Sequence, residues 1–483
     1  MTETAALLRR TAELAVAYLE TLPDRPVLGE HDVAALRREL VTPLSEAGED
    51  PAEVIEQLAE VGGRAAVAMA GPRFFGFVIG GSLPAAVAAD WLTSTWDQNA
   101  GLYVAGPAAS VVEEAVGAWL IDLFGLPPGS GYGLVTGCQM AHFTCLAAAR
   151  HAVLDRAGWD VTSRGLFGAP EIEVVVGAEA HSTIHTALQY LGLGRDRVRP
   201  VETDDQGRMR ADRLAPVLAE VPAGAPLIVC LQAGNVNTGS FDPIAEVIAL
   251  VRRRKDAWVH VDGAFGMWAA ASPTLRPLIA GHAGADSWAT DAHKWLNVPY
   301  DSGLAFVADS EAHQRAMAPP RAAYLEYGQE RDEVSWVPEF SRRARGFTVY
   351  AALRTLGRDG VRQLIERCCN LARRMAERLD AEDGVEVMND VVLNQVLVRF
   401  SAPGGGDTDT FTREVIRRVQ EEGTLWLSGT TWHDMAAMRI SVSNWSTTEA
   451  DADRSVEAIL RAARAEPRTT PTSQADGAIG HER

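Results

Sequence analysis

The sequence predicts an α/β protein with a mostly parallel sheet flanked by helices, an N-terminal helical arm and a smaller C-terminal α+β domain. Two observations support this fold class. Between residues 130 and 310, apolar runs of strand length alternate with segments of helical pattern, which is typical of a parallel sheet covered on both faces. After residue 338, helices alternate with a few strands in an α+β pattern, and the first 70 residues contain helical patterns alone.

Residues 1–70 are predicted to form the helical arm. Apolar residues recur at near-helical spacing from residue 4 to 22, and residues 31–63 suggest one or two further helices. Such an arm has little apolar surface of its own to pack on. We therefore expect it to clasp another lobe of the protein or another subunit.

Residues 71–345 are predicted to form the large α/β domain. Its first 40 residues are rich in Gly and Ala and poor in charge, which indicates a buried or interfacial layer. Strands are expected at 133–136, 172–176, 227–231, 258–261, 287–290 and 304–307, with helices at 139–154, 182–191 and 243–254. In such sheets, ligands bind beyond the carboxyl ends of the strands.

Residues 346–465 are predicted to form the smaller C-terminal α+β domain. Helices are expected near 346–356, 358–380, 408–422 and 447–464, and strands near 393–400, 424–428 and 438–443. The final residues, 466–483, are polar and contain Pro and Gly, so we expect them to be disordered.

Composition narrows the class of partner. A net charge of −19 argues against nucleic acid, because binding phosphates requires a basic surface. No uninterrupted apolar run of about 18 residues predicts a membrane span. The N-terminus has an acidic residue and polar breaks, unlike a signal peptide. The cysteines are odd in number and lack metal-ligand spacing, which favours a reduced, metal-free, cytoplasmic protein; they are Cys138, Cys145, Cys230, Cys368 and Cys369.

Lysine usage points to one candidate catalytic residue. The chain has 45 basic residues but only two lysines, Lys255 and Lys294. A guanidinium cannot condense with an aldehyde, whereas a primary amine can, and burial lowers its pKa toward the neutral form. Lys255 ends a run of arginines and is expected at a solvated helix end. Lys294 lies between apolar runs and is a candidate Schiff-base lysine; alternatively it pairs with Asp286, Asp291 or Asp301.

Three other positions fall at expected strand ends. Gly137 separates a strand from a helix, so the free backbone amides that follow could bind an anion. His181 and Asp262 follow two other strands, although each could equally be a helix cap. Pyridoxal 5′-phosphate (PLP) combines a phosphate, an aldehyde and a protonated ring nitrogen that needs a carboxylate. One PLP molecule would therefore account for Gly137, Asp262 and Lys294 together, with the His181 imidazole stacked on the ring.

The motifs PRFFGF, ADWLTST, TGCQMAHFTCLAAAR, AEAHST, SFDPI, HVDGAFG, DAHKW and MRISVSNW carry a family resemblance. From about residue 70 to 445, the chain resembles the PLP-dependent group II amino-acid decarboxylases of fold type I, which include aromatic-L-amino-acid and glutamate decarboxylases. The pair HVDGAFG and DAHKW, at this separation, is the most specific part of the match.

The resemblance implies a homodimer with interfacial active sites and an N-terminal arm that swaps across the interface. It implies decarboxylation of an L-amino acid to an amine and CO2 through an external aldimine and a quinonoid. It assigns roles to specific residues: Lys294 carries the cofactor, Asp262 binds the pyridine nitrogen and His181 stacks on the ring. The cofactor's phosphate would be held by Gly137, Cys138 and Gln139, with His293 beside it.

Four departures from the family pattern qualify this assignment. Cys138 and Gln139 replace a usual Gly and hydroxyl residue, so backbone amides or the Gln139 amide would have to serve the phosphate. Asp291 stands where an Asn is usual, and its charge would repel the phosphate unless it turns away. Gly263 replaces an Ala, which we expect to leave more space at the ring face.

The fourth departure concerns the proton donor. Where relatives have a loop tyrosine, this chain has Glu333 or Val334, with Tyr324 and Tyr327 upstream as possible substitutes. The same PLP chemistry could therefore end differently, as in an aldehyde synthase, a lyase or an aminotransferase. A catalytically silent homologue acting as a binding subunit is a further alternative.

The expected substrate is aromatic or otherwise bulky. The apolar residues near the expected pocket support this interpretation, although each of them could equally be core; they are Phe74, Phe77, Val78 and Ile79.

Overall fold

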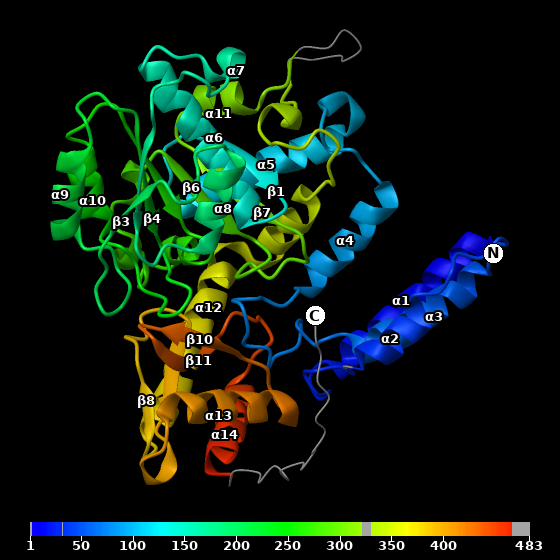
Figure 1. Ribbon diagram of the computed structural model, residues 1–483. Coiled ribbons are helices and arrows are strands. Elements are labelled where there is room, and N and C mark those ends of the chain that lie inside the picture. The colour runs from blue at the N-terminus through cyan, green and yellow to red at the C-terminus, as the bar shows by residue number, and fades with distance from the viewer. Residues whose placement is uncertain (1, 31, 321–329, 466–483) are drawn as a thin grey trace, which may run out of the picture.

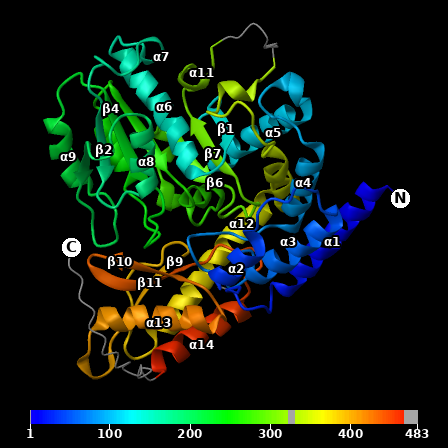
Figure 2. The same ribbon diagram turned by 45° about the vertical axis from the view of Figure 1, so that its right-hand side comes forward.

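A computed structural model describes residues 2–30, 32–320 and 330–465 (Figure 1). It confirms the predicted class: helices flank a seven-stranded mixed sheet, a smaller four-stranded sheet domain follows, and a helical arm precedes both. Figure 2 shows the arm lying along one side of the molecule. No helix among the described residues is both long and apolar enough to cross a membrane.

The arm contains α1 (Glu3–Thr21), α2 (Val33–Leu40) and α3 (Pro51–Ala65). Thr2, Asp32 and Asp50 cap their N-termini by accepting hydrogen bonds from backbone amides. Val61 is the only residue of these three helices that is fully buried. Helices α1 and α3 contact each other, but within the described part of the chain the apolar residues of the arm are only partly covered.

The large sheet has the order β1-β7-β6-β5-β4-β2-β3. Its strands are β1 (Gly131–Val135), β2 (Glu173–Gly177), β3 (Val198–Val201), β4 (Leu227–Gln232), β5 (Ala257–Asp262), β6 (Ser287–Asp291) and β7 (Gly303–Val307). Only β7 runs antiparallel to its neighbours, β1 and β6. The six predicted strands are confirmed to within two residues, whereas β3, with one buried residue of four, was not predicted.

Helices cover both faces of this sheet. On one face, α6 (Cys138–Arg156) and α8 (Ser182–Tyr190) pack over alternate strand residues such as Val176 and Trp258. On the other, α5 (Pro107–Phe124) and α10 (Ile244–Val251) pack over Val175 and Val259. The alternation follows from the two-residue period of a strand.

Further segments connect these layers. They are α4 (Pro84–Trp96), α7 (Val161–Arg164), α9 (Ala211–Glu220), α11 (Ser310–Met317), and the 3-10 turns η1 (Tyr103–Ala105), η2 (Gly266–Ala271), η3 (Arg276–Ile279), η4 (His282–Gly284) and η5 (Glu333–Ser335). A further 3-10 turn, η6 (Pro403–Gly405), belongs to the smaller domain.

The smaller domain packs four antiparallel strands, in the order β10-β11-β9-β8, against helices. Its elements are α12 (Gly346–Asp380), β8 (Val385–Val387), β9 (Gln395–Phe400), α13 (Thr408–Glu422), β10 (Ser428–Trp432), β11 (Met435–Ser441) and α14 (Glu449–Arg464). The two helices predicted at 346–356 and 358–380 are confirmed: α12 consists of two helical segments that meet at a kink at Gly357, where φ is +62°.

The predicted strand at 424–428 is wrong, because β10 begins only at Ser428. The preceding residues pair with the large domain instead. Trp426 donates its amide hydrogen to Arg73 O at 3.1 Å, and Phe75 donates its amide hydrogen to Trp426 O at 2.7 Å. This isolated parallel bridge ties the two domains together beside the candidate site.

Candidate active site

The candidate residues gather at the carboxyl edge of the large sheet. Asp262 is the last residue of β5, and Asp291 is the last residue of β6, three positions before Lys294. These neighbouring strands are parallel, so their ends lie side by side. The first turn of α6, beginning at Cys138, faces the same edge.

Lys294 pairs with Asp291: its Nζ lies 3.2 Å from Asp291 Oδ2. The other two predicted partners are engaged elsewhere, Asp286 with Arg252 and Asp301 with Arg345. Burial alone would lower the pKa of Lys294, but the nearby negative charges, led by Asp291, outweigh it and raise that pKa. The expectation that burial would lower the pKa of this amine is therefore wrong for the cofactor-free chain.

His293 and Asp291 form the next contact. Ser302 donates its backbone N–H to His293 Nδ1 at 3.1 Å, which leaves the ring proton on Nε2, 3.4 Å from Asp291 Oδ1. Burial lowers the pKa of His293, so the imidazole is neutral, and it stacks on Tyr300 with ring centroids 4.3 Å apart. Asp291 Oδ1 has no hydrogen-bond partner among the described residues.

The turn into α6 is closely packed. A Cβ added at Gly303 would lie 2.4 Å from the carbonyl carbon of Gly137, and one added at Gly137 would lie 3.2 Å from His293 Cε1. Only glycine backbone fits there. Helix geometry leaves the first amides after Gly137, those of Cys138 and Gln139, without intrahelical partners. Burial raises the pKa of the Cys138 thiol well above its usual range, so this side chain carries no charge.

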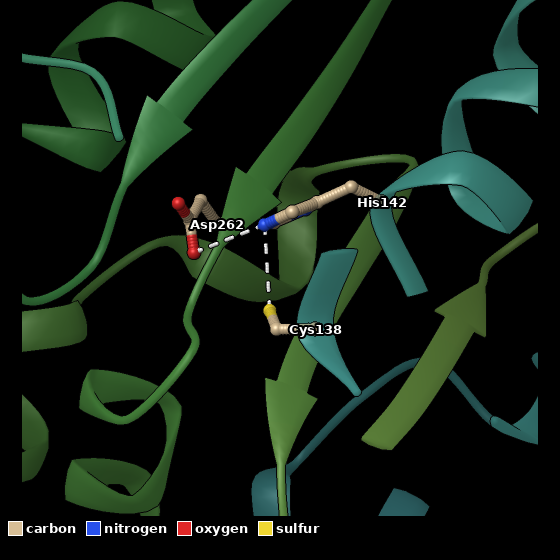
Figure 3. A group of neighbouring side chains, drawn as sticks. All are labelled: Cys138, His142 and Asp262. Carbon is tan, nitrogen blue, oxygen red and sulfur yellow. Dashed lines mark hydrogen bonds and ion pairs between the residues drawn. The ribbon is translucent and has the colours of Figure 1, made fainter. Parts of the chain in front are cut away.

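Asp262 is buried, and its Oδ1 accepts the backbone N–H of Ala264 at 3.1 Å. The same oxygen lies 3.5 Å from His142 Nε2, which is 3.4 Å from Cys138 Sγ. Figure 3 shows the His142 ring reaching from α6 to both groups. Among the described residues, these three are the one group of His, Cys, Asp or Glu side chains whose ligand atoms lie close enough together to hold a metal ion.

His181 shares a small cavity with Asp262, Cys230 and Gln232. It is also the N-cap of α8, because its Nδ1 accepts the Thr183 amide hydrogen at 3.3 Å. Burial lowers the pKa of His181, so the ring is neutral. His181 therefore caps a helix, as one of the two interpretations predicted, and also lies at the candidate site.

Gly263 does not open space at the site. A Cβ added there would lie 2.8 Å from Met267 Cβ and 3.3 Å from Ala289 O. The space that an Ala methyl group would occupy at Gly263 is filled by η2. The prediction that Gly263 leaves more space at the face of the cofactor ring is therefore wrong.

The proposed proton-donor segment is only partly described. Tyr324 and Tyr327 lie outside the described residues. Glu333 and Val334 are fully buried, and Glu333 binds Arg331 through both carboxylate oxygens at 2.9 and 3.0 Å. Arg331 in turn lies between the rings of Tyr132 and Trp336.

Sequence reasoning missed two histidines, His142 and His260. His142 lies one helical turn after Cys138, and His260 lies two residues before Asp262, on the same face of β5. Both spacings were visible in the motifs and could have indicated side chains facing the site.

Arg439 was also missed. It lies on β11, is almost fully buried and has no carboxylate within ion-pair distance among the described residues. Among the described residues, Arg439 Nη1 donates one long hydrogen bond of 3.5 Å to Asn237 Oδ1, and Arg439 Nε has no hydrogen-bond partner. Burial lowers the pKa of Arg439 to about 10, and its charge helps to lower the pKa of His181.

A sequence model described as the pyridoxal-dependent decarboxylase conserved domain matches residues 36–402. The chain belongs to the pyridoxal-dependent decarboxylase family. Aromatic-L-amino-acid decarboxylase from Bacillus atrophaeus is 27% identical, over 91% of each chain. 4-Hydroxyphenylacetaldehyde synthase from Rhodiola rosea is 25% identical, over 94% of this chain and 93% of that one.

This pyridoxal-dependent decarboxylase shares its fold with solved structures. The crystal structure of Oryza sativa TDC with PLP and tryptamine superposes with a TM-score of 0.88 at 23% identity, covering 95% of this chain and 97% of that one. Family membership makes the chain a PLP-dependent enzyme of the carboxy-lyase class.

The residues at the sheet edge fit PLP. They supply one amine, one buried carboxylate, a neutral imidazole and a glycine turn that exposes backbone amides. Asp291 is the one unfavourable group, because its carboxylate lies against the turn at Gly137.

Proposed function

We propose that the enzyme decarboxylates an aromatic or otherwise bulky L-amino acid to the corresponding amine and CO2. The main support for this proposal is that Lys294, Asp262 and the first turn of α6 lie together at the carboxyl edge of the large sheet. An aldehyde-binding amine, a carboxylate for a ring nitrogen and helix-start amides for a phosphate are the three groups that PLP requires.

Each residue has a distinct task. Lys294 would bind the cofactor aldehyde, Asp262 would hold the proton on the pyridine nitrogen, and His181 would lie against the ring. The amides of Cys138 and Gln139 would hold the phosphate. PLP supplies an electron sink for the bond that breaks at the substrate α-carbon. Asp262 sustains that sink because its charge keeps the ring nitrogen protonated.

An aromatic cluster near Lys294 supports the aromatic substrate class. A Cβ added at Gly80 would lie 1.8 Å from Lys294 O, so the segment that carries Phe77 lies against the Lys294 backbone. Phe74 stacks on Trp426 with ring centroids 5.0 Å apart, and Phe77 lies 5.1 Å from the same ring. Phe77 is 54% exposed and available to a ligand.

A second substrate class has one observation in its favour. Arg439 is a buried guanidinium without a carboxylate partner among the described residues, close enough to influence His181. An ion pair to the departing α-carboxylate would weaken as CO2 leaves and would therefore slow the reaction. Arg439 is better suited to a carboxylate on a substrate side chain, which favours an acidic amino acid.

We further propose that a second copy of the chain covers the arm. Helix α1 has no buried residue, and Leu8, Val16 and Leu19 are exposed on it. A largely apolar groove of about 630 Å³ lies between α1 and the body and is lined by Val16, Leu19, Trp91 and Trp445. Apolar surface of this kind marks an interface. The resulting homodimer would place the active sites at its interface.

The test is a panel of aromatic, aliphatic and acidic L-amino acids incubated with the PLP-loaded enzyme. Release of CO2 with one equivalent of amine supports the proposal. Release of aldehyde with ammonia and peroxide would instead support an aldehyde synthase, the alternative favoured by the similarity to 4-hydroxyphenylacetaldehyde synthase. Formation of a keto acid would indicate an aminotransferase.

A further inference from the structure

A line of hydrogen-bonded side chains runs beneath Asp262. Trp258 and His260 alternate with other residues of β5 and so lie on the same face as Asp262, the face covered by α6. Ser287 of β6 is the direct neighbour of His260 in the strand pairing. His142 of α6 lies between His260 and Asp262 and contacts both side chains.

The contacts are continuous. Trp258 Nε1 donates to Ser287 Oγ at 2.9 Å, and Ser287 Oγ lies 2.9 Å from His260 Nδ1. His260 Nε2 lies 3.0 Å from His142 Nδ1, and His142 Nε2 lies 3.5 Å from Asp262 Oδ1 and 3.4 Å from Cys138 Sγ, a weak acceptor. The first four residues of this line are completely buried. Burial lowers the pKa of both histidines to about 3, so each ring carries a single proton.

The two ends fix the direction of every bond. The Trp258 indole can only donate, and the Asp262 carboxylate can only accept. If His260 Nδ1 donated to Ser287, the Ser287 hydroxyl would have no acceptor among the described residues, and the lone pair on His142 Nε2 would face the Asp262 carboxylate. A buried hydroxyl without an acceptor is costly. With all donors pointing toward Asp262, every group in the line is satisfied.

We propose that Trp258, Ser287, His260 and His142 form a one-way hydrogen-bond chain that ends by donating to Asp262 and holds its carboxylate toward the cofactor nitrogen. The proposal rests on the role proposed above for Asp262. His142 and His260 are therefore positioning residues, acting through Asp262 without touching the substrate. The predicted tautomer is the same for both rings, with the proton on Nε2 and a lone pair on Nδ1.

Two substitutions at His142 separate this role from simple packing. In His142→Gln, the amide nitrogen takes the place of Nε2 and keeps the donor to Asp262. In His142→Asn, the amide takes the place of Nδ1 and loses that donor. We expect H142N to weaken PLP binding by the apoenzyme about ten- to a hundredfold, the scale of one hydrogen bond to a charged group. H142Q should remain within a fewfold of the parent.

The first readout is the tautomer itself. Nitrogen-15 NMR of the histidine-labelled apoenzyme and holoenzyme, assigned with H142Q, should show protonated Nε2 and unprotonated Nδ1 for His142 and His260. The second readout is the shift of nitrogen-15 in the pyridine ring of labelled PLP, which should move in H142N and much less in H142Q. Thermal unfolding identifies a variant that fails to fold.

Three results would contradict the proposed hydrogen-bond chain. The first is a proton on Nδ1 of either ring, and the second is equal PLP affinities and pyridine shifts in H142N and H142Q. The third is a stoichiometric zinc ion bound by Cys138, His142 and Asp262 in the purified enzyme. Failure of the underlying assignment is distinguishable. If Asp262→Asn leaves the pyridine shift unchanged, Asp262 does not hold that nitrogen, whatever the tautomers are.

Discussion

The Lys294 amine lies 3.2 Å from the carboxylate of Asp291, three residues before it in the chain. This ion pair raises the pKa of the amine that must bind the cofactor aldehyde. It also places a negative charge beside the turn expected to receive the phosphate. Asp291 therefore opposes cofactor loading in two ways.

Asp291→Asn should speed PLP binding by the apoenzyme at neutral pH at least severalfold. The substitution removes the charge that raises the pKa of Lys294, and each unit by which that pKa falls increases the neutral amine tenfold. The binding rate measured against pH should keep its shape and move to lower pH. Asp301→Asn is the control. Asp301 lies on the same loop as Lys294, but its carboxylate pairs with Arg345 and not with the Lys294 amine. An unmoved pH profile in D291N would refute the effect.

Lys294→Arg should abolish stable PLP attachment and reduce turnover at least about a thousandfold, because a guanidinium cannot form the bond to the aldehyde. The chain has only two lysines, so borohydride reduction followed by peptide mapping gives a clear answer. The modified peptide should contain Lys294. Lys255→Arg is the matched control and should behave like the parent. Modification of Lys255 would reject the assignment.

Arg439→Met should separate the two substrate classes. If the substrate is aromatic, we expect KM to change by less than about threefold, because the methionine fills the same apolar stem volume. If the substrate is acidic, KM should rise about a hundredfold through the lost ion pair, with a smaller change in kcat. Steady-state kinetics on the best substrate of each class decides between them.

Acid should destabilise the fold below pH 6.5. His142, His260 and His313 have pKa values lowered by burial from 6.5 to about 3, so the unfolded chain binds more protons between these values. Stability is therefore fully present above pH 6.5 and lost as pH falls toward 3. Each histidine contributes at most about 1.4 kcal/mol per pH unit.

His313→Gln tests one of these contributions away from the active site. His313 Nε2 bonds Trp336 O at 2.8 Å, and the Gln amide can keep that bond. Urea unfolding at several pH values gives the free energy of unfolding as a function of pH. Between pH 3 and 6.5, the slope of this plot should be smaller in His313→Gln than in the parent, by the equivalent of about one proton. An unchanged slope would mean that His313 is not neutral in the folded protein.

Val16→Asp with Leu19→Asp should dissociate the proposed homodimer. Both side chains are exposed on α1 and line the groove beside Trp91, so charges there would oppose burial against a second copy. Sedimentation velocity at micromolar concentration should show half the parent mass, together with lost activity. Phe167→Asp, at an apolar position that is 99% exposed and lies outside the arm, should remain dimeric. A dimeric double variant would place the interface elsewhere.

The sequence was sufficient for six of the seven strands of the large sheet and for Gly137, Asp262 and Lys294 at its edge, but not for β3, His142, His260 or Arg439. Strand and helix periods are local properties, so six strands and the helix after Gly137 were found from apolar spacing. The rarity of lysine singled out Lys294 before any geometry was known. The rule that parallel strands end at one edge then brought Asp262 and Lys294 together.

The electrostatic environment was decided only by the tertiary structure. The pKa of Lys294 depends on which carboxylate the turn brings near it, and the space at Gly263 depends on Met267 folding back from η2. The contact between His142 and Asp262 joins a helix to a strand 120 residues later, a separation at which local pattern carries no information. Periodicity sets which face a side chain occupies, but distances of 3 to 4 Å across elements arise only when the whole sheet and its helices pack.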